Sequence, residues 1–369
     1  NITVIPDAFI TTWKTDNEGI SADNQITIPV DESYTYDYTV DWGDGLTTTG
    51  LTENATHTYH QAGTYTVIIT GTFPQFQFPT TSVTESDNKK LLSVEHWGNN
   101  EWESMRASFF GAENMVLNAI DVPDLSSVED MQHMFSGAIS FNSDINNWDV
   151  SNVTDMSYMF DGAESFNKEL NNWDVSSVTT MTGMFYGASS FNSDINNWKT
   201  TSVNSFSVMF NRATNYNQPL NDWDVSNATN MYGMFGSAVN FDQDLSEWDV
   251  SKVTNTFQMF VNATKFNQNI NDWDVSKVVN MKGMFWGADR FNQPLNKWKT
   301  TSVEDLSEMF IFNDAFNQDI SGWDVSNVTD MSSMFRLAKT FDQNLSAWDI
   351  SSVTDMSSMF EGMQLSTVN

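Results

Sequence analysis

Apolar residues recur along most of this chain at intervals of 25 residues, with polar residues between them. A Met-Phe pair marks the period ten times without insertion or deletion, at 134/135, 159/160, 184/185, 209/210, 234/235, 259/260, 284/285, 309/310, 334/335 and 359/360. Tryptophan keeps the same register nine times, as Trp148, Trp173, Trp198, Trp223, Trp248, Trp273, Trp298, Trp323 and Trp348. A fixed period of roughly 20–50 residues is typical of stacked coils, each of which buries its apolar face against the next. We therefore expect like residues to stack on like residues.

The apolar spacing inside one coil predicts a short helix. Met156, Met159, Phe160 and Ala163 lie at i, i+3, i+4 and i+7, which is one face of an α-helix. Ser157 is a candidate N-cap, and we expect a helix of about two turns.

The remainder of each coil predicts strands. The segment Trp173–Val175 alternates apolar and polar residues, and Val178–Met181 has β-branched residues, so one or both should be extended. Stacked coils would pair such strands in parallel, and the Met, Phe, Trp and Val columns would form the core.

The first part of the chain has a different pattern. Residues 26–72 contain short alternating runs separated by turn residues, which predict a small antiparallel β-sandwich. Trp42 would be a core anchor on a central strand, and the glycines of Gly43–Gly45 suit a tight turn. Asp41 and Asp44 either cap their own turn or ligate Ca²⁺.

Three motifs in this part carry a resemblance. The runs Val40–Gly45 (Val-Asp-Trp-Gly-Asp-Gly), His57–Tyr59 (His-Thr-Tyr) and Gly63–Val67 (Gly-Thr-Tyr-Thr-Val) resemble the polycystic-kidney-disease (PKD) type of immunoglobulin-like domain. The resemblance covers about residues 1–80 and implies a non-catalytic spacer or interaction module of exported proteins. We therefore expect a PKD-like β-sandwich over residues 1–85, an irregular transition or capping coil over 86–125, and the repeat array over 126–369.

The repeat has the consensus Leu/Ile-x-x-Trp-Asp-Val-Ser-x-Val-Thr-x-Met-x-x-Met-Phe-x-Gly-Ala-x-x-Phe-Asn. This consensus resembles the BspA-type leucine-rich-repeat surface proteins of bacteria over roughly residues 126–363. The resemblance implies a right-handed, leucine-rich-repeat-like α/β solenoid of about ten 25-residue coils with parallel strands and short helices. It also implies export to the cell surface and adhesion or protein binding. In that group the segment like Leu365–Asn369 continues further, so we expect a truncated C-terminus.

An aspartate follows the repeat Trp in most coils, whereas Lys199 and Lys299 take its place in two. Unit charges one coil apart repel each other by about 1 kcal/mol in water, so something must offset the column. Either each Asp accepts backbone amides in a turn with the Ser two residues on, or Ca²⁺ lies between successive carboxylates. The candidate metal ligands are Asp149, Asp174, Asp224, Asp249, Asp274, Asp324 and Asp349.

A second column, between the repeat Val and Met, varies in residue type among the coils while the neighbouring positions stay constant. A surface that recognises a ligand would require such variation. An ordinary solvated face would permit the same variation, so both interpretations stay open. The candidate ligand-binding residues are Asp130, Thr154, Asp155, Thr179, Thr180, Asn204, Asn230, Asn255, Asn280, Glu304, Asp305, Asp330 and Asp355.

Three other columns are predicted to be structural. Met at helical spacing beside Phe indicates core filling rather than a soft binding surface. The repeat Trp is expected in the core, although exposed indoles would stack sugar rings. After the Phe of each Phe-Asn stand Asn142, Asn167, Asn192, Asn217, Asn267, Asn292 and Asn317, with Asp242 and Asp342 as substitutes, which predicts a ladder that satisfies buried amides between coils.

Charge and composition narrow the function. The formal net charge of −32 argues against nucleic acid and anionic membranes as partners, and favours cationic partners or divalent ions. The chain has no Cys, no apolar run long enough to span a membrane, and no metalloprotease, nucleophile-elbow or phosphate-binding motif. We expect no catalysis and no required cofactor.

The sequence therefore favours a monomeric surface or secreted binding protein whose repeat face recognises a protein ligand on a cell or in its surroundings. The alternatives are a carbohydrate-binding module that uses exposed aromatic residues, and a Ca²⁺-loaded structural spacer of a larger adhesin.

Overall fold

The computed structural model describes residues 7–80 and 86–363. The chain divides into two compact units, Asn1–Val178 and Thr179–Asn369, and each is described by itself. No helix within the described ranges has the length and apolarity needed to cross a bilayer.

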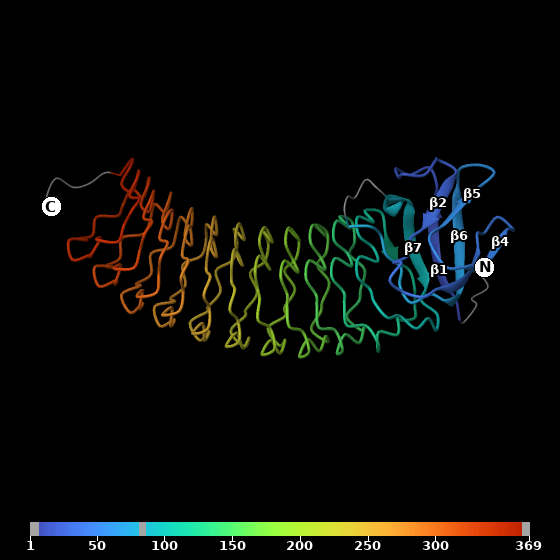
Figure 1. Ribbon diagram of the computed structural model, residues 1–369, viewed down its shortest axis with the longest axis horizontal. Helices are drawn as coiled ribbons and strands as arrows, with labels where there is room; N and C mark the ends of the chain where they lie inside the picture. The colour runs from blue at the N-terminus through green and yellow to red at the C-terminus, as the bar shows by residue number, and fades with distance from the viewer. Residues whose placement is uncertain (1–6, 81–85, 364–369) are drawn as a thin grey trace. The chain divides into compact units, whose positions relative to one another are not determined.

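The first unit begins with two β-sheets (Figure 1). The larger has the strand order β4-β3-β6-β1-β7-β8, and the smaller pairs β2 with β5. Every pairing is antiparallel except that of β7 with β8. The strands are β1 (Phe9–Lys14), β2 (Gln25–Ile28), β3 (Asp37–Asp41), β4 (Thr47–Leu51), β5 (Ala55–Thr58), β6 (Thr64–Thr72), β7 (Leu91–His96) and β8 (Val116–Leu117).

Aromatic residues fill the core between these sheets and the segment that follows. The ring of Phe9 lies 5.7 Å from that of Trp97 and 5.0 Å from that of Trp102, centroid to centroid. Trp42 is 1% exposed, which confirms it as a core anchor, but it follows the end of β3 at Asp41 rather than lying on a central strand. Its backbone N–H donates to the carbonyl of Leu46 across the tight turn.

The sheet extends past residue 85. Strand β7 pairs with β1 in a register that sets Ile10 opposite His96. Further along, the backbone N–H groups of Met105 and Phe109 donate to carbonyls of residues 130 and 134 in the next coil. The segment expected to be an irregular transition thus joins the sheet at one end and bonds to the repeat coils at the other.

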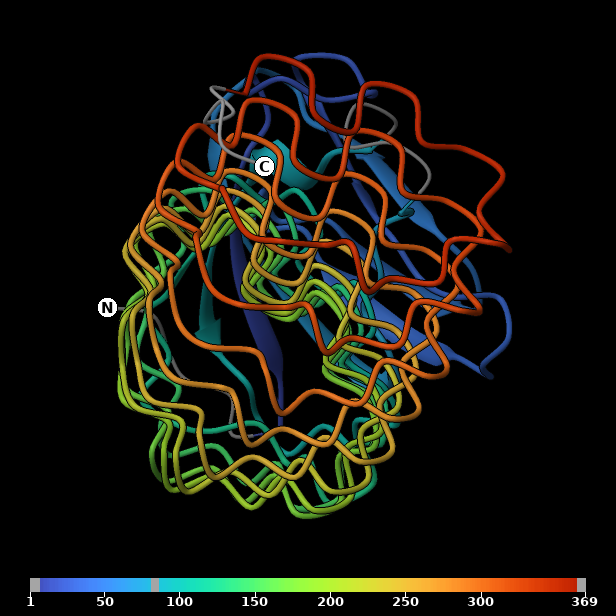
Figure 2. The same ribbon diagram turned by 90° about the vertical axis from the view of Figure 1, so that its left-hand side faces the viewer.

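Successive coils of the second unit are joined by parallel backbone hydrogen bonds. Isolated one-residue bridges run in series from Thr180–Ser205 to Asp330–Asp355, one at each junction. In Figure 1 the coils of residues 179–363 follow one another in chain order, and Figure 2 shows them overlying one another. The expected stacking of like residues is therefore present within this unit.

The predicted helix of each coil is wrong, and with it the α/β solenoid with short helices. Within the described residues the sole helical element is η1 (Asn88–Lys90), a single 3₁₀ turn. Of the two segments of which one or both were expected to be extended, Trp173–Val175 contains no strand, and Val178–Met181 pairs in parallel with the next coil through Thr180 alone rather than as a continuous strand. The described chain is β-strand and turn.

The hydrogen bonds of residues 181–188 give the physical reason. The N–H groups of Met181, Gly183, Phe185 and Gly187 donate to the following coil at 2.7–3.1 Å, whereas those between them close local turns. An α-helix would direct every N–H along its own axis and would leave the neighbouring coil without donors. Alternate N–H groups directed sideways permit stacking and still place the apolar residues at i, i+3, i+4 and i+7 inside the coil.

This backbone requires a left-handed residue at two places in every coil. One precedes the Met of the Met-Phe pair, and the other follows that Met by three residues. The first set includes Tyr158, Gly183, Val208, Gly233, Gln258, Gly283, Glu308 and Ser333, and the second includes Gly162, Gly187, Arg212, Ser237, Asn262, Gly287, Phe312 and Leu337, all with φ between 49° and 67°. Side chains with a β-carbon are unfavourable there by about 1–2 kcal/mol each, so stacking must outweigh that strain.

Candidate ligand-binding face of the repeat coils

Two neighbouring columns contain the candidate ligand-binding residues. The outer column stands five residues before the Met of each Met-Phe pair and comprises Glu129, Thr154, Thr179, Asn204, Thr229, Thr254, Val279, Glu304, Thr329 and Thr354. The bridge column stands four residues before that Met and comprises Asp130, Asp155, Thr180, Ser205, Asn230, Asn255, Asn280, Asp305, Asp330 and Asp355.

The bridge column is tied to the backbone. Its side-chain oxygen accepts the N–H of the residue two places on, as in the 3.0 Å bond from Tyr232 to Asn230 and the 2.8 Å bond from Ser307 to Asp305. The side chain is half-buried in every coil but the last. One oxygen of each bridge residue is therefore occupied in shaping the turn.

The outer column is the more exposed of the two. The backbone N–H of Thr254 donates to the carbonyl of Thr229, and its hydroxyl donates to the same oxygen at 3.2 Å. Every residue of this column except the half-buried Thr154 is exposed, and Val279 is 38% exposed.

The structure brings the candidate residues together within each unit. Those from Thr179 to Asp355 form one continuous strip in the second unit, whereas Asp130, Thr154 and Asp155 form a short run in the first. The strip changes character along its length. It is neutral from Thr179 to Asn280 and acidic from Glu304 onward.

The short run in the first unit is electrostatically unusual. Burial raises the pKa of Asp130, against the opposing effects of the Gln132 N–H and of Arg106, whose Nη1 lies 3.6 Å from Asp130 Oδ2. Burial also lowers the pKa of His133, and its Nδ1 is buried without a hydrogen-bond partner. The neutral forms of both groups are thus favoured relative to free side chains.

Sequence reasoning missed an aromatic pair beside the neutral half of the strip. Tyr232 and Phe257 stack with ring centroids 5.1 Å apart and planes 8° from parallel, and both are half-exposed. They stand two residues after Asn230 and Asn255 of the bridge column. Comparing that position between coils would have revealed them, because most other coils have Ser, Thr or Gln there.

The Asp column after the repeat Trp adopts the first of its two expected arrangements. In each case Oδ1 accepts the N–H of the Ser two residues on at 3.0–3.1 Å, for Asp149, Asp174, Asp224, Asp249, Asp274, Asp324 and Asp349. Hydrogen bonds from that Ser lower the pKa of Asp149, Asp224, Asp274, Asp324 and Asp349.

The two candidate Ca²⁺ ligands of the first sheet also cap turns. Asp41 accepts the N–H of Gly43 and Asp44 that of Leu46, both at 3.0 Å, and Asp44 Oδ2 lies 2.9 Å from His57 Nε2. Across the described part of the chain, no group of three or more His, Asp or Glu side chains converges to hold a metal ion. The Ca²⁺ assignment therefore gains no support from these aspartates.

The repeat tryptophans lie in the core, with 2–9% of each exposed. Their indole N–H groups bond across the coil junctions, as in the 2.9 Å bond from Trp223 Nε1 to the carbonyl of Ile195. A carbohydrate site built on these indoles accordingly lacks its stacking surface.

The asparagine ladder is confirmed. Asn267 Oδ1 accepts the N–H of Asn292 at 3.0 Å in the following coil, and Asp242 Oδ1 accepts that of Asn267 at 2.9 Å. The ladder side chains are half-buried or exposed rather than fully buried. The column is structural and contributes to coil register.

Comparison with known proteins identifies a family for the repeat region. No curated protein and no solved structure matches the chain. One family matches residues 103–218, 194–295 and 268–368, which together span more than half of the chain. The chain therefore belongs to the family described as "Mycoplasma protein of unknown function, DUF285".

Proposed function

We propose that the chain is a non-catalytic binding protein and that its outer and bridge columns recognise a protein ligand. The observation that carries this proposal is the contrast between backbone and side chains along the strip. The N–H groups of Thr229, Thr254 and Val279 all donate to the coil before, so the backbone is the same in each coil. The side chains of the two columns change along the stack, for example from Thr254 and Asn255 to Val279 and then to Glu304, which gives a rigid surface whose chemistry varies along its length.

The charge of the strip supports a partner with two kinds of surface. A neutral, hydroxyl- and amide-bearing stretch would contact the half from Thr179 to Asn280. A basic stretch would contact the half that begins at Glu304, because complementary charge steers encounter and fixes register. The net charge of −32 disfavours nucleic acid and anionic membranes in the same way.

We place this activity outside the cell or at a bacterial cell surface, with the chain acting as a monomer and requiring no cofactor. What supports this location is the sequence resemblance to BspA-type surface proteins and, in the first part of the chain, to PKD-like spacer domains. Detection of the chain on intact cells by surface-restricted proteolysis would test it, and full protection from added protease would contradict it.

Recognition by the strip is tested with an array of purified extracellular proteins, probed with the labelled chain. We expect a saturable protein signal that the double variant Thr254→Lys/Thr329→Lys loses. The matched control is Gly322→Lys/Ala347→Lys, which adds the same two charges at exposed positions where another coil naturally has Lys297. Equal binding by both variants would rule out the strip as the recognition surface.

A carbohydrate ligand is the second candidate, and the stacked, half-exposed Tyr232–Phe257 pair favours it. Aromatic faces beside amide side chains suit sugar rings, since the ring stacks while the amides bond to hydroxyls. A glycan array probed with the chain and with Tyr232→Ala/Phe257→Ala distinguishes the two candidates. Glycan signal that is lost in this variant would favour carbohydrate, and a silent array would eliminate it.

A further inference from the structure

One coil of the second unit departs from the repeat at a corner that contains no outer- or bridge-column residue. We call the five residues after the Phe of each Met-Phe pair the corner segment, which is Ile311–Ala315 in this coil. In the other coils from Ala188 to Ala338 the third residue of the corner segment is a buried alanine, whereas here it is Asn313. The second residue is Phe312, where the other coils of this unit have Gly, Arg, Ser, Asn or Leu. Two adjacent residues thus break the pattern together.

Asn313 rebuilds the corner turn at a cost. Its Oδ1 accepts the N–H groups of Ala315 at 3.2 Å and of Phe316 at 3.1 Å. In the preceding coil the corresponding N–H, that of Phe291, donates to the backbone carbonyl of Ala288 instead. The side chain of Asn313 is fully buried, and its Nδ2 has no hydrogen-bond partner. An N–H that is desolvated without an acceptor is unfavourable, so the alanine of the other coils would serve stability better.

Phe312 is unfavourable for the isolated chain as well. Its φ is 56°, a left-handed conformation that Gly187 and Gly287 adopt in other coils without side-chain strain. The side chain is 46% exposed, so much of its apolar surface stays in water. Residues that break local preference without a gain in packing are expected at functional sites. The turn therefore presents an aromatic side chain that stability alone does not explain.

Apolar side chains continue along this corner in the neighbouring coils. Trp286 is the first residue of the preceding corner segment and Leu337 the second residue of the following one, and both are half-exposed. The N–H of Gly287 donates to the carbonyl of Ile311 at 2.7 Å, and the next junction is bonded in the same way. Partly exposed apolar side chains thus stand on three directly stacked coils, as at an interaction surface rather than as scattered single residues.

The same corner carries cations that the fold leaves unpaired. Lys265 and Arg290 are the last residues of two successive corner segments, and both are exposed. Lys265 Nζ donates to an amide oxygen of the coil before, and across residues 7–80 and 86–363 neither side chain has a carboxylate within ion-pair distance. The acidic residues of these corner segments are Asp289 and Asp314, and Asp314 pairs with Lys339 at 2.8 Å. An acidic group from outside the chain would complement Lys265 and Arg290.

We propose that this corner binds a segment of another protein in which an apolar side chain is flanked by carboxylates. The apolar side chain would pack against Phe312 and Trp286. A carboxylate would pair with Arg290, whose planar guanidinium can hold it through two hydrogen bonds. Aromatic residues and Arg are the types enriched at protein interfaces. Charges more than about 8 Å away are screened at physiological salt, so these local cations act in spite of the net charge of the chain.

The site shares no residue with the outer and bridge columns and does not depend on the function proposed for them. Its test uses the full ¹⁵N-labelled chain, titrated at physiological salt with the capped peptide Gly-Glu-Phe-Glu-Gly. We expect the indole N–H resonance of Trp286, assigned with Trp286→Phe, to shift saturably. Absence of that shift at millimolar peptide would overturn the proposal.

Two altered peptides examine the ligand class. The peptide with Gln in place of both Glu should bind about three- to tenfold more weakly, because each exposed ion pair contributes little. The peptide with Ser in place of Phe should bind at least about tenfold more weakly, because it loses the larger apolar contact. Equal binding of all three peptides would refute the stated chemistry. Displacement of the Glu-Phe-Glu peptide by heparin, which has no apolar side chain, would assign the corner to polyanions instead.

The cations are tested with a matched pair of variants. Lys265→Gln/Arg290→Gln should weaken binding of the Glu-Phe-Glu peptide about three- to tenfold. The control is Lys252→Gln/Lys277→Gln, which removes the same charge from exposed positions on successive coils whose lysines act on the Asp column. This control should change binding less than about twofold, and equal losses would attribute binding to overall charge and refute the site.

Phe312→Ser separates a binding role from a structural one. Serine stands at the equivalent position as Ser237, with a φ of 55°, so the substitution suits the backbone. We expect peptide binding to fall at least about tenfold while the melting temperature stays constant or rises. Leu46→Ser, at an apolar residue that is 58% exposed elsewhere, should leave binding unchanged. Retained binding in Phe312→Ser, or a lower melting temperature, would overturn the role assigned to Phe312.

Discussion

Single residues in this protein adopt backbone conformations that their side chains disfavour. Val208 is β-branched and has a φ of 49°, in the left-handed region where such residues are rarely found. The strain persists because the N–H of Val208 donates to the carbonyl of Tyr232 in the next coil at 2.7 Å. Hydrogen bonds to the neighbouring coil thus hold such residues in a backbone conformation that their own side chains disfavour.

Glycine at such a position should be difficult to replace. In Gly287→Ala a β-carbon would meet the side-chain oxygen of Asn262 and would occupy a residue with a φ of 65°. We expect the free energy of unfolding to fall by about 1–3 kcal/mol, from left-handed strain and the clash together. Urea denaturation of the variant and of the unsubstituted chain measures this difference in the free energy of unfolding.

The matched control is Gly322→Ala. Gly322 has no atom within 4 Å of the new β-carbon and no positive φ. Its unfolding midpoint should stay constant or rise slightly, because alanine restricts the unfolded chain. Equal destabilisation of the two variants would mean that the left-handed positions are not specially constrained.

Two aspartates of the first unit should respond to pH in opposite ways. Burial raises the folded-state pKa of Asp161, against a 3.3 Å hydrogen bond from Ser136. A raised carboxyl pKa means that the stability associated with this group is present at acid pH and is lost as pH rises above the unfolded value of about 3.9. Asp161→Asn should therefore stabilise the protein at pH 7 and have little effect at pH 3.

Asp149 provides the opposite case. Hydrogen bonds from Ser151 lower its pKa, so its contribution is present above the unfolded value and is lost as pH falls through the depressed folded value. Asp149→Asn should destabilise at pH 7 more than at pH 3. Melting temperatures of both variants between pH 3 and 7 check the signs, and parallel pH profiles would contradict the assignment.

The element that the sequence misrepresented is the eight-residue segment around each Met-Phe pair. Its apolar spacing correctly predicts which residues are internal, since Met181, Met184, Phe185 and Ala188 are all fully buried. The spacing i, i+3, i+4, i+7 fits a helix and equally fits consecutive turns whose alternate N–H groups face the next coil. A single coil cannot distinguish them, because the choice depends on where the neighbour's carbonyls lie.

The asparagine ladder is an element that residue type alone could predict. Only a side chain with an acceptor oxygen can cap the N–H of the following coil, and both Asn and Asp have one. Asn267 Oδ1 accepts from the backbone of Asn292 and, at 3.1 Å, from Gln293 Nε2.

The effect of replacing Asn267 on stability should therefore depend on whether the new side chain keeps an acceptor oxygen, and not on its charge. We expect Asn267→Ala to lower the free energy of unfolding by about 1–3 kcal/mol, because a half-buried N–H loses its partner. Asn267→Asp should be close to neutral, since Asp242 has the same role one coil earlier. Thermal unfolding compares the two, and equal losses would show that the amide group rather than the acceptor is required.

At the scale of the whole molecule, charge is the dominant property. The chain has a net charge of −32, and the repeat places many of its carboxylates one coil apart. Repulsion between these carboxylates weakens as salt shortens the screening length to about 10 Å at 0.1 M. We expect the melting temperature to rise from low to moderate ionic strength.

Sodium chloride titrated in differential scanning calorimetry tests this expectation. A melting temperature that stays flat from 10 mM to 300 mM, roughly a fivefold change in screening length, would contradict it. Repeating the titration with Asp272→Asn, which removes the partner of Lys297 at 2.6 Å, separates local ion pairs from general repulsion.

Sequence alone determined which residues of this protein are internal and which coils are equivalent. The period of 25, the buried Trp, Met and Phe columns, Trp42 as a core anchor and the asparagine ladder all follow from residue types at fixed spacing, because burial and hydrogen-bonding capacity are properties of the side chain. The variable columns could be named on the same grounds.

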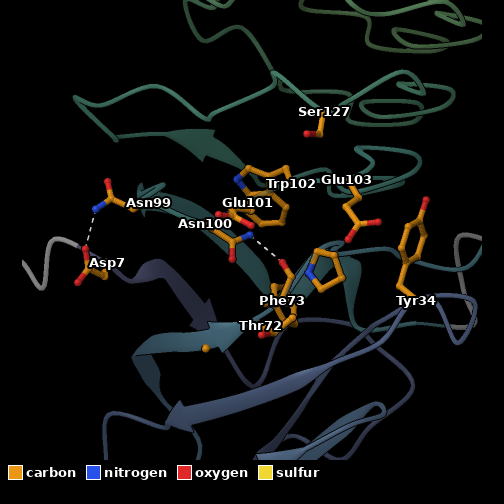
Figure 3. A pocket seen from close by; sticks show the side chains of 12 residues that line it. Asp7, Tyr34, Thr72, Phe73, Asn99, Asn100, Glu101, Trp102, Glu103 and Ser127 are labelled. Carbon is orange, nitrogen blue, oxygen red and sulfur yellow. Dashed lines mark hydrogen bonds between the residues drawn. The ribbon is translucent and has the colours of Figure 1, made fainter.

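Only the tertiary structure decided the backbone that links these residues. Whether an N–H closes a turn or bonds to the next coil depends on the position of an acceptor 24 to 26 residues away, which no local pattern encodes. A cavity of about 750 Å³ in the first unit also arises only in three dimensions, since folding brings Asp7, Tyr34 and Glu103 into one lining (Figure 3). Local spacing fixes what is buried, and long-range pairing fixes how the chain turns to bury it.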